Sequence, residues 1–254
     1  MEKRSPLQDS PLPQAGTSSR QRIDDLLDRE LLNWAAVMVA AWLVAAYEWL
    51  HYLRWVRVAP WVVTSAALVV TVWFISKWAR VMPQVRRLKL GSEGEQVVGQ
   101  MLEGLRAWGY SVFHDISDDG FNIDHVVVGP GGVFAMETKT ISKRTGARVT
   151  YDGQRVLVDG REMDRDPIKQ AGALADRVQE ILKRETRRDV DVRPVVLFPG
   201  WWVEPLPRPR PRVWVLNAKN VAGFIANEPP KLSPEDVALY SARIGDWAKR
   251  RNAS

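Results

Sequence analysis

The sequence contains no cysteine among its 254 residues. This absence excludes disulfide bonds, cysteine-based metal sites and thiol nucleophiles, and it fits a reducing compartment. The chain also lacks an internal repeat, and no apolar segment closely follows Met1, so we expect no cleavable signal peptide. Its length is enough for one sizeable domain with accessory segments.

Acidic residues are fewer than basic ones, 30 against 36, which leaves a formal net charge of +6. This balance suits polyanionic partners, namely nucleic acid or anionic lipid. Because basic chains are common, the charge alone does not choose between them. Residues 1–30 are polar and rich in Ser, Pro, Gln and Arg, which predicts a disordered tail.

Two long apolar runs follow this tail. Leu31 to Leu50 is interrupted only by Asn33 and Glu48, and Val58 to Ile75 contains only mildly polar exceptions. Each run is close to the roughly 20 residues that a helix needs to cross a bilayer core. Most of the seven tryptophans in this region lie near the predicted helix ends, where indole rings favour the membrane interface. The seven are Trp34, Trp42, Trp49, Trp55, Trp61, Trp73 and Trp78. The pattern predicts a transmembrane hairpin over residues 31–80, with a buried helical hairpin as the alternative.

The short linker of this hairpin, His51 to Arg57, places both chain termini on one side of the bilayer. Basic residues are more numerous on the two flanks of the hairpin than in its linker, so both termini are expected in the cytoplasm. The sequence thus predicts a two-pass protein of the plasma membrane. Residues 81–90 form a basic juxtamembrane linker suited to anionic head groups, and pairing of hairpins leaves homo-oligomer formation open.

From Gly91 onward the composition is that of an α/β domain. One helix is expected over Ser92–Trp108, and a second begins at Pro167 with Asp166 as its N-cap. Strands are expected at 111–116, 123–129, 132–139, 148–151, 155–158, 192–198 and 213–216. Shorter helices near Val221 and over 234–250 close the chain.

Two of these strands form a predicted β-hairpin that carries three charged residues. Pro130-Gly131 has the composition of a turn, and symmetric pairing about it makes paired residue numbers sum to 261. Asp124 then faces Glu137, and Lys139 projects from the same face. Like charges directly opposite are unfavourable, and a divalent cation between them would remove the conflict. The alternative is a salt bridge between Lys139 and a carboxylate at a solvated strand end.

The segment Gly91-Ser92-Glu93-Gly94-Glu95 opens the first helix of the predicted domain. Ser92 and Glu95 match a capping box, in which both side chains satisfy free backbone donors at a helix start. On that interpretation Glu95 is structural, and the glycines let the helix start approach a neighbour closely.

The chain at this point resembles a known family through four motifs in order: Gly91-x-x-Gly94-Glu95, then Ile123-Asp124-His125-Val126-Val127-Val128, then Gly132-Val133-Phe134-Ala135-Met136-Glu137-Thr138-Lys139, then Asp166-Pro167-x-x-Gln170-Ala171. They are similar to the successive motifs of the nuclease-related domain, NERD, which is itself similar to the PD-(D/E)xK nuclease superfamily. The resemblance covers roughly residues 91–200 and leaves 201–254 as a C-terminal extension. It implies a mixed β-sheet core flanked by helices.

The resemblance also implies roles for individual residues. Asp124 and Glu137 would hold a metal ion, Mg²⁺ or Mn²⁺, with the backbone carbonyl of Thr138 as a third ligand. Lys139 would position or help deprotonate the attacking water and stabilise the phosphate. Glu95 would approach the same site as a direct or water-mediated ligand, and Gln170 would orient water or phosphate.

Further basic and aromatic residues suit contact with nucleic acid. Lys143 and Arg144 lie in a basic loop after the third motif. Arg208, Arg210 and Arg212 alternate with prolines, which favours an extended arm along phosphates, although a plain linker is equally consistent. Trp201 and Trp202 precede this arm, where they either stack on bases or lie buried. His125 is expected to point to the face opposite Asp124 and to be packed there.

Two functions from different classes follow from these patterns. The first is a membrane-anchored, divalent-metal-dependent nuclease that hydrolyses phosphodiester bonds of cytoplasmic nucleic acid, with DNA expected in preference to RNA. The second is a catalytically inactive nuclease-like module that binds nucleic acid or a protein partner at the membrane.

Overall fold

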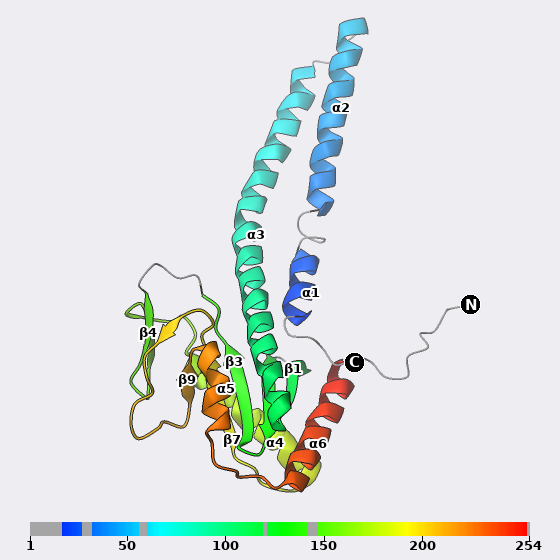
Figure 1. Ribbon diagram of the computed structural model, residues 1–254. Coiled ribbons are helices and arrows are strands. Elements are labelled where there is room, and N and C mark those ends of the chain that lie inside the picture. Colours follow the sequence, from blue (N-terminus) through cyan, green and yellow to red (C-terminus); the bar gives the residue numbers. More distant parts are fainter. Residues whose placement is uncertain (1–16, 27–31, 56–59, 119–120, 142–146, 253–254) are drawn as a thin grey trace, which may run out of the picture. The chain divides into compact units, whose positions relative to one another are not determined.

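A computed structural model describes residues 17–26, 32–55, 60–118, 121–141 and 147–252. The chain divides into two compact units, one formed by Ser19–Lys89 and the other containing Leu90–Ser254. Each unit is considered by itself below, with the elements labelled as in Figure 1.

The described residues form six α-helices, one 3₁₀ segment and nine strands. The helices are α1 (Thr17–Leu26), α2 (Asn33–Trp55), α3 (Pro60–Glu103), α4 (Pro167–Thr186), α5 (Ala218–Ala226) and α6 (Pro234–Asn252), with the 3₁₀ segment at Gly104–Trp108. The strands are β1 (Ser111–Asp118), β2 (Phe121–Gly129), β3 (Gly132–Thr138), β4 (Arg148–Tyr151), β5 (Val156–Val158), β6 (Arg161–Glu162), β7 (Val192–Leu197), β8 (Trp202–Val203) and β9 (Trp214–Leu216).

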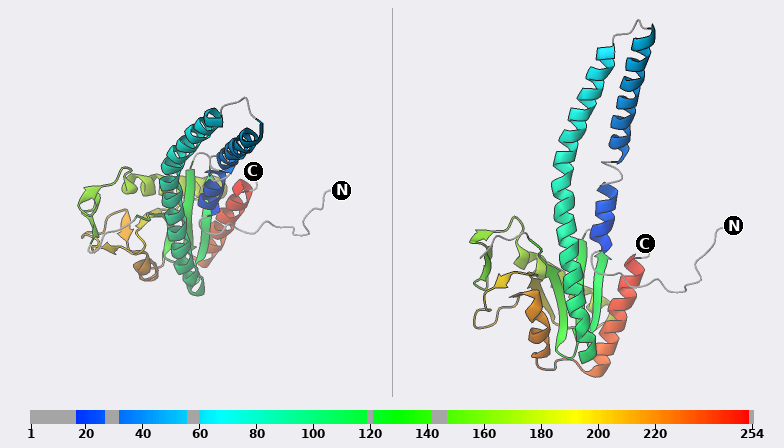
Figure 2. Two further views of the ribbon diagram at one scale, coloured as in Figure 1. Left: turned by 90° about the horizontal axis from the view of Figure 1, so that it is seen from above. Right: turned by 45° about the horizontal axis from the view of Figure 1, so that its top comes forward.

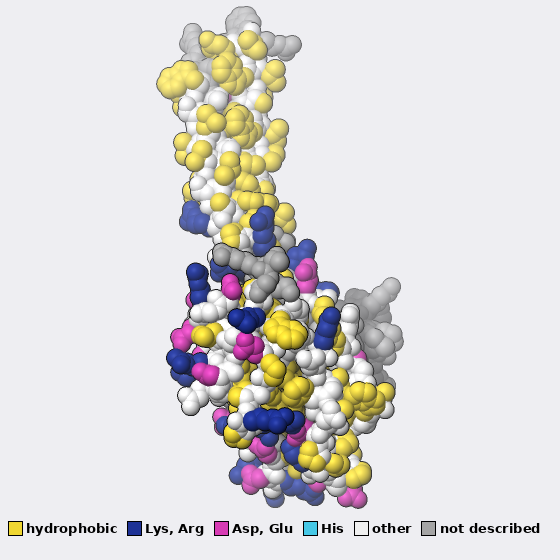
Figure 3. All heavy atoms as spheres, turned by 60° about the vertical axis from the view of Figure 1, so that its left-hand side comes forward, with side chains coloured by type: hydrophobic (Ala, Val, Ile, Leu, Met, Phe, Trp, Pro, Cys, Tyr) yellow, Lys and Arg dark blue, Asp and Glu magenta, His cyan; other side chains and the backbone are white. Residues whose placement is uncertain are grey.

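In the first unit, polar groups join α2 and α3 on the inside of the helix pair. Trp42 donates from Nε1 to Oγ1 of Thr71 at 2.9 Å, and Trp49 donates likewise to Thr64 at 2.7 Å. Large apolar side chains instead face outward, as Figure 3 shows along this unit. Both helices are long and apolar enough to cross a membrane. This arrangement, polar contacts inside and apolar side chains outside, is the one that lipid favours.

Two expectations about this region need correction. The predicted disordered tail, residues 1–30, contains a helix at Thr17–Leu26, while 1–16 and 27–30 lie outside the described residues. Serine and threonine at its start favour helix initiation, and glutamine, arginine and leucine within it favour propagation.

The second correction concerns the helix start expected at Ser92, since α3 runs as one helix through the predicted linker at 81–90 and ends at Glu103. Pro83 lies inside the helix, and Gly91 and Gly94 do not interrupt it. Met82, Gln84 and Arg86 near Pro83 are good helix formers, and the helix continues despite the hydrogen bond that the proline removes. Ser92 is therefore in a helix interior, where the free backbone donors that a capping box satisfies are absent. The capping-box interpretation of Ser92 and Glu95 was wrong.

The second unit is built on a five-stranded mixed sheet in the order β1-β2-β3-β7-β9. The first three strands pair antiparallel, and β3, β7 and β9 run parallel. The pairing of β2 with β3 runs from His125 opposite Met136 to Gly129 opposite Gly132, so paired numbers sum to 261 as predicted. The mixed α/β fold expected from the sequence is confirmed.

Helices cover both faces of this sheet, which Figure 2 shows from two directions. Val126 and Val128 of β2 pack in one core with residues of α4 and α6, whereas Val127 packs in another core with residues of α3 and α5. Because side chains alternate across a strand, a strand buried on both sides must be apolar throughout. This explains why β2 and β3 are apolar except at the ends that carry charged residues.

A smaller four-stranded sheet, in the order β6-β5-β4-β8, stands beside the main one. Its core joins Val149 and Tyr151 to Ala171 of α4 and to Val196 and Val215 of the main sheet. The sequence indicated β4 and β5 as a hairpin but missed β6 and β8, which are two residues each. Strands this short carry too little periodicity to be recognised in a sequence.

Candidate active site

The candidate site lies where β2 begins and β3 ends. Asp124 is one position beyond the last regular pair of these strands, and the same register continued by one residue sets it opposite Glu137. The backbone N–H of Thr138 donates to Oδ2 of Asp124 at 2.7 Å, which holds that carboxylate in place. Lys139 donates from Nζ to Oε1 of Glu137 at 2.5 Å, and both side chains are less than one-fifth exposed. The predicted one-face arrangement of these residues is therefore present.

The electrostatic state of Asp124 reflects the acidic residues gathered around it. Burial raises the pKa of this carboxyl well above its usual range, and the neighbouring Glu137 and Glu95 raise it further. The hydrogen bond from Thr138 and the charge of Lys139 act in the opposite direction but are outweighed. Three carboxylates thus compete for one region, and a cation there would stabilise the ionised form of each.

Glu95 reaches this region because α3 comes unusually close to the end of β3. A Cβ atom added at Gly94 would stand 1.7 Å from Oγ1 of Thr140 and 2.7 Å from its Cβ, so no side chain fits at position 94. Gly91, three residues earlier, has nothing within 4 Å of such an added atom. The glycine at 94 therefore permits the contact that brings the next residue, Glu95, to Asp124.

Two side-chain oxygens at or just beyond the end of β3, and one in the first turn of α4, are buried without a hydrogen-bond partner among the described residues. They are Oγ1 of Thr138, Oγ1 of Thr140 and Oε1 of Gln170. Buried oxygens of this kind are ordinarily satisfied by ordered water or a bound cation. The donor set is made of hard oxygens, the type that Mg²⁺ and Mn²⁺ prefer, so the residues fit such an ion. No cluster of three or more His, Asp or Glu side chains preformed for metal binding is present in the described part of the chain.

Gln170 belongs to the first turn of α4, where Asp166 caps the helix by accepting from the N–H groups of Ile168 and Lys169. Its neighbour Ala171 packs in one core with Val196, the β7 residue that pairs with Glu137. The predicted cap and helix start are confirmed. They place Gln170 on the helix that covers the face from which Glu137 projects.

His125, the residue after Asp124, is fully buried and lies in a different cluster. Its Nδ1 is 2.8 Å from Nδ1 of His114, whose Nε2 is 2.8 Å from Oε1 of Glu103 on α3. Burial, followed by the charge of His114, lowers the pKa of His125 well below its usual range. The sequence indicated that His125 is packed, but not that it pairs with His114, because the partner depends on the register of β1 against β2.

The predicted nucleic-acid contacts are distributed differently. Lys143 and Arg144 lie outside the described residues. Arg212 is paired with Asp176 at 2.5 Å and Arg210 with Glu228 at 3.1 Å, so two of the three arginines of the arm are held by carboxylates. The third, Arg208, has no ion pair within the described part of the chain.

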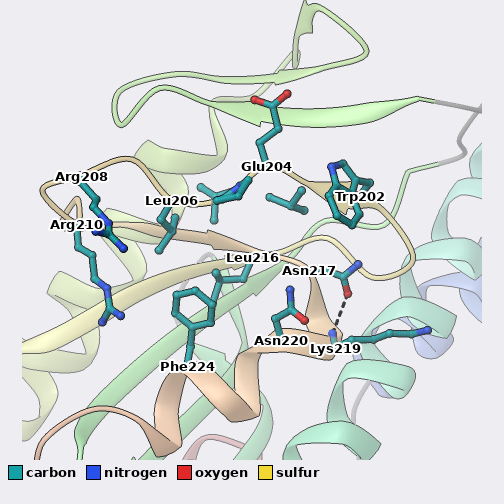
Figure 4. A pocket seen from close by; sticks show the side chains of 13 residues that line it. Trp202, Glu204, Leu206, Arg208, Arg210, Leu216, Asn217, Lys219, Asn220 and Phe224 are labelled. Carbon is teal, nitrogen blue, oxygen red and sulfur yellow. Dashed lines mark hydrogen bonds between the residues drawn. The ribbon is translucent and has the colours of Figure 1, made fainter.

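The sequence did not reveal that this arm lines a pocket. Trp202, Asn220 and Phe224 line it together with Arg208 (Figure 4). Its walls come from β8, the arm, the end of β9 and α5, which follow one another within the stretch from Trp202 to Phe224. The exposed tryptophan beside a Pro-Arg repeat was the available signal.

Comparison with known proteins agrees with the geometry. Neither a curated protein nor a solved structure matches the chain. A family model described as the nuclease-related domain, NERD, matches residues 90–199, a range that holds Glu95, Asp124, Glu137, Lys139 and Gln170. The segment that gathers the acidic residues and the lysine at the end of β3 is therefore a nuclease-related domain.

Proposed function

We propose that this protein is a membrane-anchored, divalent-metal-dependent nuclease that hydrolyses phosphodiester bonds of cytoplasmic nucleic acid, with DNA preferred to RNA. One observation carries the proposal: Asp124, Glu137 and Lys139 meet at the end of β3 beside Glu95, within a nuclease-related domain. Metal-dependent hydrolysis of a phosphodiester uses carboxylates that hold the cation and a positive side chain beside the phosphate, and Asp124, Glu137 and Lys139 offer both kinds of group.

The proposed metal ligands are Asp124, Glu137 and the carbonyl oxygen of Thr138, with Glu95 as a direct or water-mediated ligand. A Mg²⁺ or Mn²⁺ ion bound there supplies a nucleophile at neutral pH and neutralises charge on the phosphate oxygens. The N–H of Thr138 holds Asp124 through its 2.7 Å hydrogen bond, so one ligand is oriented before any ion binds.

Lys139 is proposed to place positive charge beside the reacting phosphate. Its ammonium group is held 2.5 Å from Glu137, and the Lys139 side chain as a whole is 18% exposed, so it is not sealed from solvent. The amide of Gln170 is proposed to orient water or phosphate from the first turn of α4, because its buried Oε1 has no partner among the described residues. These groups stabilise negative charge that develops on the phosphate.

The hairpin of α2 and α3 is proposed as the membrane anchor. Lys77 lies 5.4 Å from the ring of Trp34 and 5.5 Å from the ring of Trp73, a cation and indole arrangement typical of a membrane interface. The basic flanks of the hairpin favour a cytoplasmic location for both termini and for the nuclease-related domain.

The absence of cysteine makes sidedness directly measurable. Ser233→Cys in the nuclease-related unit should react with a membrane-impermeant maleimide only after cells are opened, whereas Tyr52→Cys near the hairpin tip should react in intact cells. Labelling of Ser233→Cys in intact cells would reverse the proposed orientation.

The competing proposal is a non-catalytic module that binds nucleic acid or a protein partner at the membrane. The observation in its favour is that Lys139 and Glu137 already satisfy each other, while the described residues hold no preformed cluster of metal-binding side chains. An ion must displace or share this salt bridge, and a module without turnover would keep it.

The two proposals are separated by digesting plasmid and single-stranded DNA, and RNA, with the full-length protein in detergent. Cleavage is expected with Mg²⁺ or Mn²⁺ and not with EDTA, and Glu137→Ala or Lys139→Ala should lower it at least about 100-fold. Glu162→Gln and Lys183→Ala are controls for lost charge, because both side chains are more than three-fifths exposed elsewhere in the unit. Cleavage that is unchanged in Glu137→Ala or Lys139→Ala would refute the nuclease proposal.

A further inference from the structure

A pocket of about 650 Å³ lies outside the segment that matches the nuclease-related domain (Figure 4). Its volume is in the range of sites that hold small organic ligands or one unit of a polymer. None of the residues that line the pocket belongs to the candidate site around Asp124 and Glu137. The pocket therefore needs an explanation of its own.

The pocket opens at the same edge of the main sheet as the site. Thr138 of β3 pairs with Leu197 of β7, which pairs in turn with Leu216 of β9, and Leu216 lines the pocket. Ligands of α/β sheets gather at the carboxyl ends of parallel strands, where all three residues lie. Because neighbouring strands are about 4.8 Å apart, two strand spacings separate the pocket from the end of β3 by roughly 10 Å.

Two adjacent tryptophans at the pocket differ sharply in environment. Trp201 is 3% exposed and donates from Nε1 to the carbonyl of Ile141 at 3.1 Å, so it is a core residue. Trp202 is 70% exposed and lines the pocket. An indole ring left in solvent beside a cavity has lost hydrophobic stabilisation, and stacking on a planar apolar ligand would restore it.

The cations of the pocket are only partly neutralised. Arg210 pairs with Glu228 and lies over the ring of Phe224, whereas Arg208 and Lys219 form no ion pair within the described part of the chain. Glu204 is the one acidic residue of the lining, lies 3.6 Å from Arg148 and points away from the side of the pocket formed by α5 (Figure 4). The pocket is therefore suited to an anion.

One amide side chain remains available for recognition. Asn217 is already committed, since its Oδ1 accepts from the N–H of Lys219 and its Nδ2 donates to the carbonyl of Trp201. Asn220 points into the pocket (Figure 4), and its side-chain amide has no hydrogen-bond partner among the described residues. An amide offers one acceptor and two donors, the pattern found along the edge of a nucleobase.

We propose that this pocket binds one nucleotide of an unpaired nucleic-acid strand. The base stacks on Trp202 and its edge meets Asn220, while Arg208 and Lys219 contact the adjoining phosphate. A base inside a duplex cannot present its ring face in this way, so the pocket selects single-stranded segments. The choice of a nucleic-acid ligand rests on the proposed function, but binding is measurable without cleavage.

The test uses full-length protein in a non-ionic detergent, with EDTA present to suppress cleavage. Fluorescence anisotropy of a labelled 12-nucleotide single strand of mixed sequence reports its affinity, and an unlabelled duplex of the same sequence serves as competitor. Trp202→Ala should weaken binding of the single strand about 5- to 100-fold, and Trp202→Phe should recover most of that loss because a phenyl ring still stacks. Trp108→Ala is the matched control, since this tryptophan is 55% exposed on the 3₁₀ segment.

Two further variants test the polar contacts. Asn220→Ala should weaken binding about 2- to 10-fold, and Arg208→Gln should flatten the dependence of log affinity on log salt by about 0.7. Equal affinity in Trp202→Ala and the wild type, or an equal loss in Trp108→Ala, would overturn the proposal. Thermal unfolding of each variant establishes that the fold is retained.

Adenosine monophosphate as a second probe distinguishes a strand from a free nucleotide. If micromolar adenosine monophosphate fails to displace the labelled strand, the pocket is a strand site. If the nucleotide displaces the strand at a concentration equal to that of the strand, the pocket is a free-nucleotide site and the strand assignment is overturned. The outcome is separable from catalysis. Loss of strand binding in Trp202→Ala supports the proposed strand site even if the protein shows no metal-dependent cleavage. Normal cleavage together with normal strand binding in Trp202→Ala rejects the strand site and leaves the nuclease proposal standing.

Discussion

Two neighbouring residues of β2 lie in opposite clusters of ionisable groups. Asp124 meets Glu137, Glu95 and Lys139, and burial together with the two glutamates raises its pKa. His125, on the other side of the strand, meets His114, which continues to Glu103, and burial lowers its pKa. In both places burial is the largest cause and favours the uncharged form of the β2 residue. The neighbours differ, since carboxylates surround Asp124 and a histidine lies beside His125.

The difference sets the candidate site apart from the histidine cluster. Histidines and a glutamate form a chain of donors and acceptors that satisfies most of its own members. Carboxylates only accept when ionised, so a group of them depends on donors and cations from outside the group. Lys139 and the N–H of Thr138 supply part of this here, and a bound cation would supply more. Burial alone therefore does not mark the site, whereas an excess of acceptors does.

The largest expected effect tests this contrast on catalysis. Asp124→Asn keeps the shape of the side chain but removes the charge proposed to hold the metal, and it should lower metal-dependent cleavage at least about 100-fold. His125→Leu, one residue away on the other face, should change it less than about 3-fold. Initial rates of plasmid cleavage at pH 7.5 measure both, and equal losses would show that the two clusters act together.

The next effect concerns the close approach that brings Glu95 to the acidic cluster. Gly94→Ala places a Cβ 1.7 Å from Oγ1 of Thr140, so it should destabilise the fold by about 3 kcal/mol. Gly91→Ala on the same helix meets nothing within 4 Å and should be neutral or stabilise by up to about 1 kcal/mol. Thr140→Gly should restore much of the stability of Gly94→Ala. Chemical denaturation gives these values, and equal behaviour of the two glycines would contradict the contact.

A smaller effect is expected from metal on stability. In EDTA, folding raises the pKa of Asp124. The folded state therefore loses stability relative to the unfolded state as pH rises above the pKa that Asp124 has in the unfolded chain. Asp124→Asn should therefore melt at a higher temperature than wild type at pH 7, by a few degrees, and the gain should fade below about pH 4. Millimolar Mg²⁺ should raise the melting temperature of the wild type and not of the variant. Equal shifts in both proteins would place the ion elsewhere.

The smallest effect is a change in acid sensitivity at the histidine pair. Folding lowers the pKa of His125, so the unfolded chain takes up a proton first and stability falls as pH drops below about 6.5. His125→Leu should remove part of this loss between about pH 5 and 6.5, at a cost near 1 kcal/mol at pH 7.5 because His114 loses its partner. Unfolding free energies at several pH values test it, and an unaltered acid slope would show that another group titrates.

Expectations that depended on local spacing were confirmed. Turn residues at Pro130-Gly131 and the two-residue period of the strands determine the register that opposes Asp124 to Glu137. Asp166 followed by Pro167 determines the start of α4, because capping acts within a few residues. The ordered motifs around these residues likewise identified the domain that the family model matches at 90–199.

Expectations that depended on distant neighbours were wrong or missing. Ser92 and Glu95 have the spacing of a capping box, but the helix continues past them, and Gly94 is needed for a contact with Thr140. The pairing of His125 with His114 and the pocket beside Trp202 also join residues from separate strands and helices.

The amino-acid sequence by itself thus determined the apolar helices, the paired strands with opposed carboxylates, and the type of domain. Short-range physics is enough for the helices and strands, since periodicity, turn chemistry and capping act between residues close in the chain. The type of domain came from the resemblance of four ordered motifs to a known family. The tertiary structure alone decided that Glu95 joins Asp124, that Nδ1 of His125 meets a second histidine, and which side chains line the pocket. Such contacts depend on how helices and strands pack, and packing is set by residues far apart in the chain.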